Sequence, residues 1–259
     1  TIQTNTEDAS NYTIKVNGTA VTAPYATNNN TITKRKVNLK FADVSRQYNG
    51  VSGNTSITPS LSNAGDAAVL NTDNAGLVDG ANKLVGLTGI TSDYGTGTTD
   101  ATFTADPNAG TNKNVQYRGI QRAMGTALGT NAGNYEFADT GYGKGRIDKA
   151  QINGNNVTFT AHDAHKVYDG TTVVKYNGSS DANAVKNYIS NIGVTSVDGH
   201  YIPLGNDVEM DVANTHYSSP NATNGTPDTV TYRFRIKSNN FTNNGKDIFD
   251  ATTHGTIDR

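Results

Sequence analysis

The stretch "HKVYDGTTVVKY", residues 165–176, has a second version in the same chain of 259 residues. That version is "SRQYNGVS", residues 45–52, in which Tyr48 takes the place of Tyr168. Asp-Gly in one copy and Asn-Gly in the other are both preferred pairs for a two-residue turn that needs positive φ. An exchange of Asp for Asn suits a turn and not catalysis, because only Asp carries a charge. We therefore predict a tight turn that joins two strands, and we expect Tyr48 and Tyr168 to anchor it on the core. The predicted turn residues are Asn49, Gly50, Asp169 and Gly170.

Further matches extend the repeat over nearly the whole chain. "NLKFADVSRQYNG" (38–50) aligns with "VTFTAHDAHKVYDG" (157–170). The repeats close with strands centred on Ile32, Ile147 and Ile257, which gives a period of about 115 residues. A period of that length corresponds to a complete domain and excludes a β-helix, whose period is about 20 residues. The predicted organisation is the C-terminal part of a preceding repeat at residues 1–36, a first whole repeat at 37–152 and a second at 153–259.

Within a repeat the pattern is mostly strand, with alternation at residues 157–161 and 230–236. One segment differs: "DANAVKNYISNIG" (181–193) places apolar residues on one helical face, after a capping Asp181 and before a terminating Gly193. A weaker version lies at residues 77–89. The sequence predicts tandem, mostly β modules of the Ig-like sandwich type, each with one short helix. The alternative is a β-grasp-like α+β module, in which a sheet wraps the single helix.

The predicted cores are thin, because hydrophobic residues make up only 34% of the chain. The net charge is also small, at −2, whereas disordered chains combine low hydrophobicity with high net charge. We therefore predict a folded, polar, β-rich protein. The side chains expected inside the first module are Leu39, Phe41, Tyr48, Val115, Tyr117, Tyr135, Phe137 and Ile147. Those expected inside the second are Val157, Phe159, Tyr168, Val230, Tyr232, Phe234 and Ile257.

The composition also restricts the function. The absence of cysteine excludes disulfides, thiolate nucleophiles and Cys-ligated metal centres. A near-neutral charge argues against nucleic acid, which requires a basic face. No apolar run approaches the roughly 18 residues of a membrane helix, so we expect no membrane insertion. Hydrolase motifs such as Gly-x-Ser-x-Gly and His-Glu-x-x-His are missing, so we expect no enzymatic activity.

The repeat resembles the YDG repeat of large, secreted, haemagglutinin-like surface adhesins of Gram-negative bacteria. The resemblance rests on "KVYDGTT" (166–172), on "AGNY" (132–135) and on the closing strands, and it covers nearly the whole chain. In the second copy, "NNGKDIF" (243–249) stands where we expect Ala-Gly-Asn-Tyr. The resemblance implies Ig-like modules in tandem at the bacterial cell surface, with stalk or adhesive roles, and no catalytic residues.

Several candidate sites are weaker than their structural alternatives. His162 and His165 point to opposite faces of an extended strand, which suits solvated histidines better than metal ligands. The glycine-rich stretch 141–145 lacks a following helix, so we expect a β-bulge or a kink before the closing strand and not a phosphate loop. The acidic loop 198–211 could supply oxygen ligands for calcium, but it has no EF-hand or glycine-rich nonapeptide pattern. The sequence singles out no Lys–Asn isopeptide pair.

Two functions remain. The first is a structural shaft, in which short linkers stack neighbouring repeats end to end and each module adds roughly 30 Å of reach. The second is an adhesive module that binds a glycan, a host matrix protein or another bacterial cell. Exposed tyrosines in loops would then be the contacts, because aromatic rings stack on sugars. The candidates are Tyr94, Tyr142, Tyr201 and Tyr217.

Overall fold

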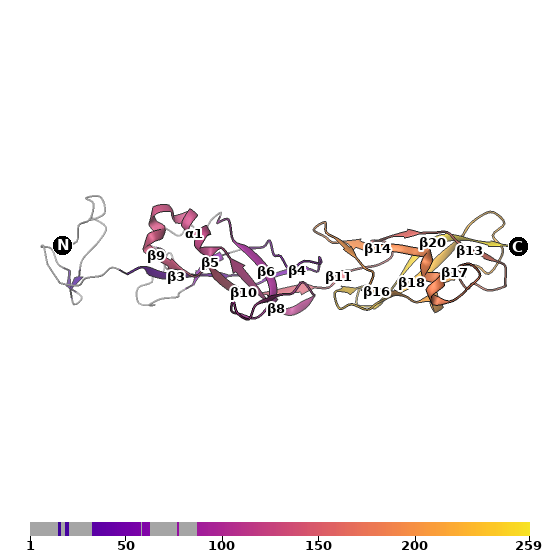
Figure 1. Cartoon of the computed structure of the whole chain (residues 1–259), viewed down its shortest axis with the longest axis horizontal. Helices are drawn as coiled ribbons and strands as arrows, with labels where there is room; N and C mark the ends of the chain where they lie inside the picture. Colours follow the sequence, from indigo (N-terminus) through magenta and orange to yellow (C-terminus); the bar gives the residue numbers. More distant parts are fainter. Residues whose placement is uncertain (1–14, 17–18, 21–32, 58, 63–76, 78–86) are drawn as a thin grey trace.

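The computed structural model describes residues 15–16, 19–20, 33–57, 59–62, 77 and 87–259. The predicted preceding repeat lies mostly outside these residues, as does the weaker helix at 77–89. Of the N-terminal part, β1 (Lys15–Val16) and β2 (Thr19–Ala20) pair antiparallel. The rest forms two halves that lie end to end along the long axis (Figure 1). We call residues 33–149 the first module and residues 150–259 the second module.

The first module is built from two sheets. Their orders are β4-β10-β8-β6-β7 and β5-β3-β9. The helix α1 (Ile120–Leu128) and the 3-10 helix η4 (Gly129–Asn134) connect β8 to β9. The strands are β3 (Arg35–Phe41), β4 (Val44–Gln47), β5 (Pro59–Ser62), β6 (Thr91–Thr96), β7 (Thr104–Ala105), β8 (Gly110–Arg118), β9 (Tyr135–Phe137) and β10 (Thr140–Asp148).

The second module has the same plan. Its sheets have the orders β12-β14-β15 and β13-β20-β18-β16, with β17 also on β18, while β11 pairs with β19. The strands are β11 (Ala150–Gln151), β12 (Val157–Ala161), β13 (Ala164–Val167), β14 (Ile189–Thr195), β15 (Tyr201–Pro203), β16 (Val208–Met210), β17 (His216–Tyr217), β18 (Asp228–Ile236), β19 (Phe241–Thr242) and β20 (Ile248–Asp258). The short helical turns are α2 (Ala182–Val185), η5 (Lys186–Tyr188) and η6 (Val212–Asn214). The class is therefore mostly β, as predicted.

In both modules the chain changes sheets after its first long strand. β3 pairs antiparallel with β5, and after two residues β4 pairs parallel with the closing strand β10. Likewise β12 pairs antiparallel with β14, and β13 pairs parallel with the closing strand β20. The registers correspond, since Val44 faces Gly145 and Ala164 faces Gly255. The predicted repeat is thus a repeat of topology.

The glycine at the start of each of these parallel pairings leaves room for a buried tyrosine. A Cβ on Gly145 would lie 2.5 Å from the Tyr94 ring, and a Cβ on Gly255 would lie 2.9 Å from the Tyr217 ring. Each tyrosine also sits opposite a valine of the central strand, Val115 or Val230. The register of β10 shifts between Gly145 and Ile147, which confirms the predicted bulge.

The predicted core is largely confirmed. All of the side chains predicted inside the first module are buried, and so are Val157, Val230, Tyr232, Phe234 and Ile257 in the second. Phe159 is partly buried against the core. Tyr168 is the exception: 52% of its surface is exposed, so the expectation that it anchors its turn on the core is wrong.

The predicted helix at residues 181–192 is mostly absent. Asp181 does cap a helix, because its side chain accepts a hydrogen bond from the Asn183 N–H. That helix ends at Val185, and a 3-10 turn leads into β14, which contains the expected terminator Gly193. Ile189 and Ile192 therefore belong to a strand. The apolar residues at 185, 188, 189 and 192 fit a helical face, but pairing with β12 and β15 outweighs that local preference.

The predicted hairpin is also wrong. Gly170 and Gly50 do have positive φ, at 73° and 85°. However, β13 pairs with β20, and Val173 bridges to His216 instead of returning along β13. The Asp-Gly pair is a corner at which the chain leaves the direction of β13 and does not fold back along it.

Strand pairing corrects the alignment of the repeats at their ends. Tyr135 faces Arg35 across the parallel pair β3–β9, and Phe241 faces Ala150 across the parallel pair β11–β19. Phe241, and not "NNGKDIF", therefore occupies the place of the tyrosine in Ala-Gly-Asn-Tyr. Because β11 pairs with β19, we count Ala150 and Gln151 with the second module.

We predict that Gly255→Ala destabilises the second module by about 1–3 kcal/mol, because the methyl group would overpack the Tyr217 ring and the Ala164 carbonyl. Denaturant unfolding followed by circular dichroism measures this. The control is Gly205→Ala, where an added Cβ meets no atom within 4 Å. Equal midpoints for the two variants would contradict the packing account.

Candidate functional site at the junction of the modules

The junction between the modules contains no slack linker. β10 ends at Asp148 and β11 begins at Ala150. The Ala150 N–H donates to the Asn240 carbonyl at 2.9 Å, and the Ile152 N–H donates to the Thr242 carbonyl at 2.9 Å. The chain therefore enters the second module as a paired strand, and side chains of both modules can meet in a fixed geometry.

Tyr48 is the aromatic contact of the junction. Its backbone N–H donates to the Asp148 carbonyl at 2.8 Å, which fixes the Tyr-Asn-Gly corner beside the end of the closing strand. Its ring meets the Phe241 ring edge to face, with centroids 5.2 Å apart at 86°. Only 9% of Tyr48 and 2% of Phe241 are exposed. Burial, together with the nearby Asp207 carboxylate, raises the pKa of Tyr48.

Asn49 supplies a polar contact next to this aromatic pair. Its Oδ1 accepts the Val51 N–H at 3.1 Å, and its Nδ2 donates to Asp198 Oδ2 of the second module at 2.5 Å. Asn49 is buried. Hydrogen bonds from Ser196, Asn49 and His200 lower the pKa of Asp198, so this carboxylate is ionised at neutral pH.

Asn240 makes the reciprocal contact from the second module. Its Oδ1 accepts the Ala109 N–H at 2.8 Å, and its Nδ2 donates to Asn108 Oδ1 at 3.0 Å. It is buried as well. Its side-chain amide thus binds residues 108–109 of the first module, and its backbone carbonyl binds Ala150 at the start of β11, which restrains rotation of one module against the other.

A basic side chain supports the corner in each module. The Arg46 guanidinium lies over the Tyr94 ring, 5.1 Å from its centroid, and donates to the Val51 carbonyl. The equivalent Lys166 ammonium lies 5.5 Å from the centroid of Tyr217 and donates to the Thr171 carbonyl at 2.6 Å. These cation–π contacts connect the corner to the tyrosine that packs on the closing-strand glycine.

The corner of the second module is charged. Asp169 Oδ1 lies 2.8 Å from Lys166 Nζ, and Asp169 Oδ2 lies 2.7 Å from Lys175 Nζ. Asp169 Oδ1 also accepts the Thr171 N–H at 3.0 Å. These partners hold the pKa of Asp169 far below its ordinary value. The predicted turn residues Asp169 and Gly170 are thus in a corner like that of Asn49 and Gly50, but with an ion-pair cluster.

The four tyrosines proposed as ligand contacts do not form a site. Tyr94 and Tyr217 are fully buried, so their expected exposure is wrong: both pack under the closing strands. Tyr142 is partly buried, and its hydroxyl donates to Asp100 at 2.5 Å. Only Tyr201 is largely exposed, at 54%.

The part of the chain that the structure describes contains no cluster of three or more His, Cys, Asp or Glu side chains suited to a metal ion. In the loop weighed for calcium, Asp198 accepts hydrogen bonds from Asn49 and Ser196, and Asp211 pairs with Arg235 at 2.9 Å. His165 Nε2 lies 2.7 Å from Asp258 Oδ2 on the closing strand, whereas His162 is exposed where the chain changes sheets.

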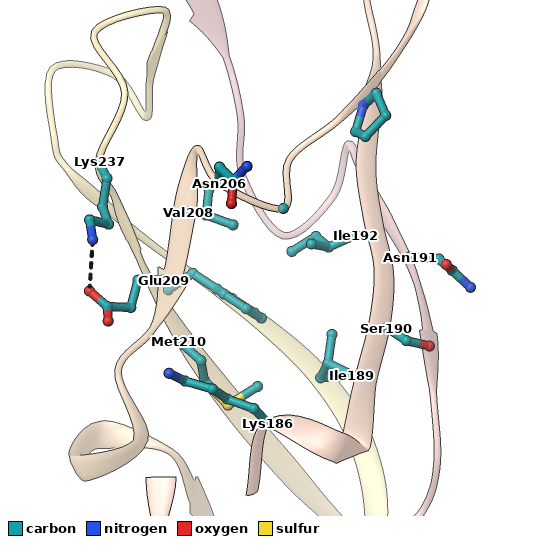
Figure 2. A pocket seen from close by; sticks show the side chains of 13 residues that line it. Lys186, Ile189, Ser190, Asn191, Ile192, Asn206, Val208, Glu209, Met210 and Lys237 are labelled. Carbon is teal, nitrogen blue, oxygen red and sulfur yellow. Dashed lines mark ion pairs between the residues drawn. The ribbon is translucent and has the colours of Figure 1, made fainter. Parts of the chain in front are cut away.

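A cavity of about 540 Å³ opens between the edges of the two sheets in the second module. Ile189 and Ile192 of β14 and Val208 and Met210 of β16 point into it from opposite sides (Figure 2). At its rim, Lys237 and Glu209 form an ion pair of 3.6 Å. Among the described residues that line the cavity, we find no cluster of catalytic side chains. The cavity is the place where the hydrophobic core of the second module opens to solvent.

Comparisons with protein-family models, with curated proteins and with solved structures found no match. Among the described residues, no helix is both long and apolar enough to cross a membrane.

The sequence singled out the Tyr-Asn-Gly corner on the first module's side of this junction. It did not indicate the partners on the second module's side, which are Phe241, Asn240 and Asp198. A signal for two of them was present: "NNF" (239–241) resembles "GNY" (133–135). Asp198 carries no such signal, because a loop aspartate beside glycine is common in any turn.

We predict that Tyr48→Ala lowers the unfolding free energy by about 2–3 kcal/mol, because it empties a buried aromatic site. Tyr168→Ala, at the equivalent and exposed position, is the control and should change it by less than about 0.5 kcal/mol. A double-mutant cycle of Tyr48 with Phe241 should give a coupling of about 0.5–1.5 kcal/mol. Equal losses for Tyr48→Ala and Tyr168→Ala would contradict the junction.

We also predict a pH dependence from Asp169. Because folding lowers the pKa of this carboxyl below its unfolded value of about 3.9, its stabilising effect is complete above that pH and is lost as the pH falls further. Asp169→Asn should therefore lower the denaturant midpoint at pH 7, and its difference from the unaltered chain should shrink between about pH 4 and pH 2. Asp163→Asn is the exposed-carboxylate control. A difference that grows on acidification would contradict the ion-pair cluster.

Proposed function

We propose that the chain is a run of extracellular spacer modules in the shaft of a bacterial surface adhesin. Its work is mechanical: it holds an adhesive region at a fixed distance from the cell. Adjacent modules of the same chain are its partners, and no catalytic step is involved. The observation that carries this proposal is the junction, in which buried contacts and a paired exit strand join the modules end to end.

The junction suits such a role because it resists bending by several independent contacts. The aromatic pair Tyr48–Phe241 excludes water, and the amides of Asn49 and Asn240 fix direction. Interfaces between domains of one chain are by default mobile unless they are well packed. A spacer needs this kind of fixed joint, whereas an enzyme or a lone binding domain does not.

We further propose that the modules are Ig-like sandwiches. Two features support this: two sheets share one core, and the chain passes from one sheet to the other after its first long strand. The β-grasp alternative required a single helix wrapped by a sheet. In the second module that helix is reduced to Ala182–Val185 and a 3-10 turn, which favours the sandwich.

The second candidate function is an adhesive module that binds a glycan, a matrix protein or another cell. One observation favours it: the exposed Tyr201 side chain lies close against Gly193 of β14, where an added Cβ would be 2.2 Å from the tyrosine hydroxyl oxygen. Its hydroxyl donates to the Asn191 carbonyl at 3.3 Å. A fixed, exposed ring of this kind can stack on a sugar face.

A binding screen separates the two functions. The chain is coupled to beads and tested against a glycan panel, matrix proteins and bacterial cells, with calcium and with a chelator. The spacer proposal predicts no saturable binding. Saturable binding that Tyr201→Ala abolishes and Tyr168→Ala leaves intact would overturn the spacer and establish the adhesive function, because Tyr168 is the other tyrosine that is mostly exposed among the described residues.

A further inference from the structure

We propose that the corner of the second module, which we call the distal corner (Val167, Tyr168, Asp169, Gly170, Val173 and Lys175), is a docking end for another module of the kind formed by residues 150–259. This inference rests on the proposed spacer function and names the partner of the exposed end. It also assigns Lys175 a role: its ammonium replaces the Asn49 amide as the group that receives the acidic residue of the incoming module.

The distal corner has the same backbone as the corner used at the junction. The Tyr168 N–H donates to the Asp258 carbonyl at 2.7 Å, just as the Tyr48 N–H donates to Asp148 at 2.8 Å. The next side chain accepts the N–H two residues on in both copies, at 3.0 Å and 3.1 Å. A glycine with positive φ follows in each. The two tyrosines are therefore presented in the same way at the ends of their modules.

The two corners differ in what covers them. At the junction, Tyr48 is packed under Phe241, and a Cβ on Gly50 would be 3.7 Å from Ile202 of the second module. At the distal corner Tyr168 is 52% exposed, and Val167 and Val173 are 64% and 45% exposed. The contrast lies in the tyrosine: Tyr48 is 9% exposed at the junction, whereas Tyr168 at the equivalent position is 52% exposed, with the exposed Val167 directly before it.

The charges of the distal corner suit an acidic partner. A carboxylate at the place of Asn49 would by itself repel a residue like Asp198. Asp169, however, is paired with both Lys166 and Lys175, so the cluster keeps one net positive charge. The junction corner also has one, from Arg46 beside the neutral Asn49. Lys166 is buried, whereas the side chain of Lys175 is 31% exposed and can reach an incoming carboxylate.

The partner that would cover the distal corner is inferred from the side of the junction that the second module provides. A matching face needs an aromatic ring, an amide and an acidic loop, which Phe241, Asn240 and Asp198 provide. In this chain those three side chains already contact the first module, so they cannot also cover the distal corner of their own module. A further copy of residues 150–259, attached in the same way, supplies the face.

Tyrosine nitration tests this directly. A second copy of residues 150–259 is joined after Arg259 of the full chain, and tetranitromethane modification of each tyrosine is followed by mass spectrometry. We expect the nitration rate of Tyr168 in the original module to fall by about tenfold, because modification then requires the joint to open. Tyr201 in both copies, and the Tyr168 equivalent of the added copy, should remain reactive and serve as internal controls.

Two variants make the result specific. Phe241→Ala with Asp198→Lys, placed only in the added copy, should restore the reactivity of Tyr168 without altering the distal corner. Lys175→Glu should do the same, whereas Lys186→Glu, away from the corner, should not. An unchanged nitration rate in the extended chain, or protection that survives the change at Phe241 and Asp198, would overturn the inference. Neither outcome would touch the spacer proposal, which the binding screen decides separately.

Discussion

The structure depends on a buried tyrosine that packs against a glycine of the closing strand and beneath a basic side chain. Tyr94 on Gly145 and Tyr217 on Gly255 set the depth at which the closing strands lie on the core. Arg46 and Lys166 then link these rings to the corner that follows the parallel strand. Because the corner is held at the end of the closing strand, the core of each module determines what its end presents to a neighbour.

The junction fixes the position of one module relative to the other. Its contacts include one aromatic pair and two buried amides, and each amide is satisfied on both its oxygen and its nitrogen. A buried amide left without partners costs about 1–3 kcal/mol, so small rotations of one module against the other are penalised. Apolar packing alone would tolerate sliding. The polar contacts give the joint its single geometry.

The sequence predicted the features that repeat locally and missed those that depend on distant partners. The period, the closing strands at Ile147 and Ile257 and nearly all of the core follow from alternation and alignment. The helix at 181–192 failed because strand pairing overrides a short helical pattern, and the hairpin failed because β13 pairs with a strand far along the chain. Asn49 and Asp198 are separated by 149 residues, and no local pattern connects them. Tyr48 is buried and Tyr168 is exposed although their sequence motifs match, because Phe241 of the neighbouring module covers Tyr48.

The most direct test is the distribution of distances between one spin label on each module. The chain has no cysteine, so Thr126→Cys on α1 and Thr252→Cys on β20 give two unique labels on exposed positions. A fixed joint predicts one narrow distance distribution, which broadens when Tyr48→Ala and Asn240→Ala are introduced together. A broad distribution in the otherwise unaltered chain would contradict the account, because the modules would then move independently.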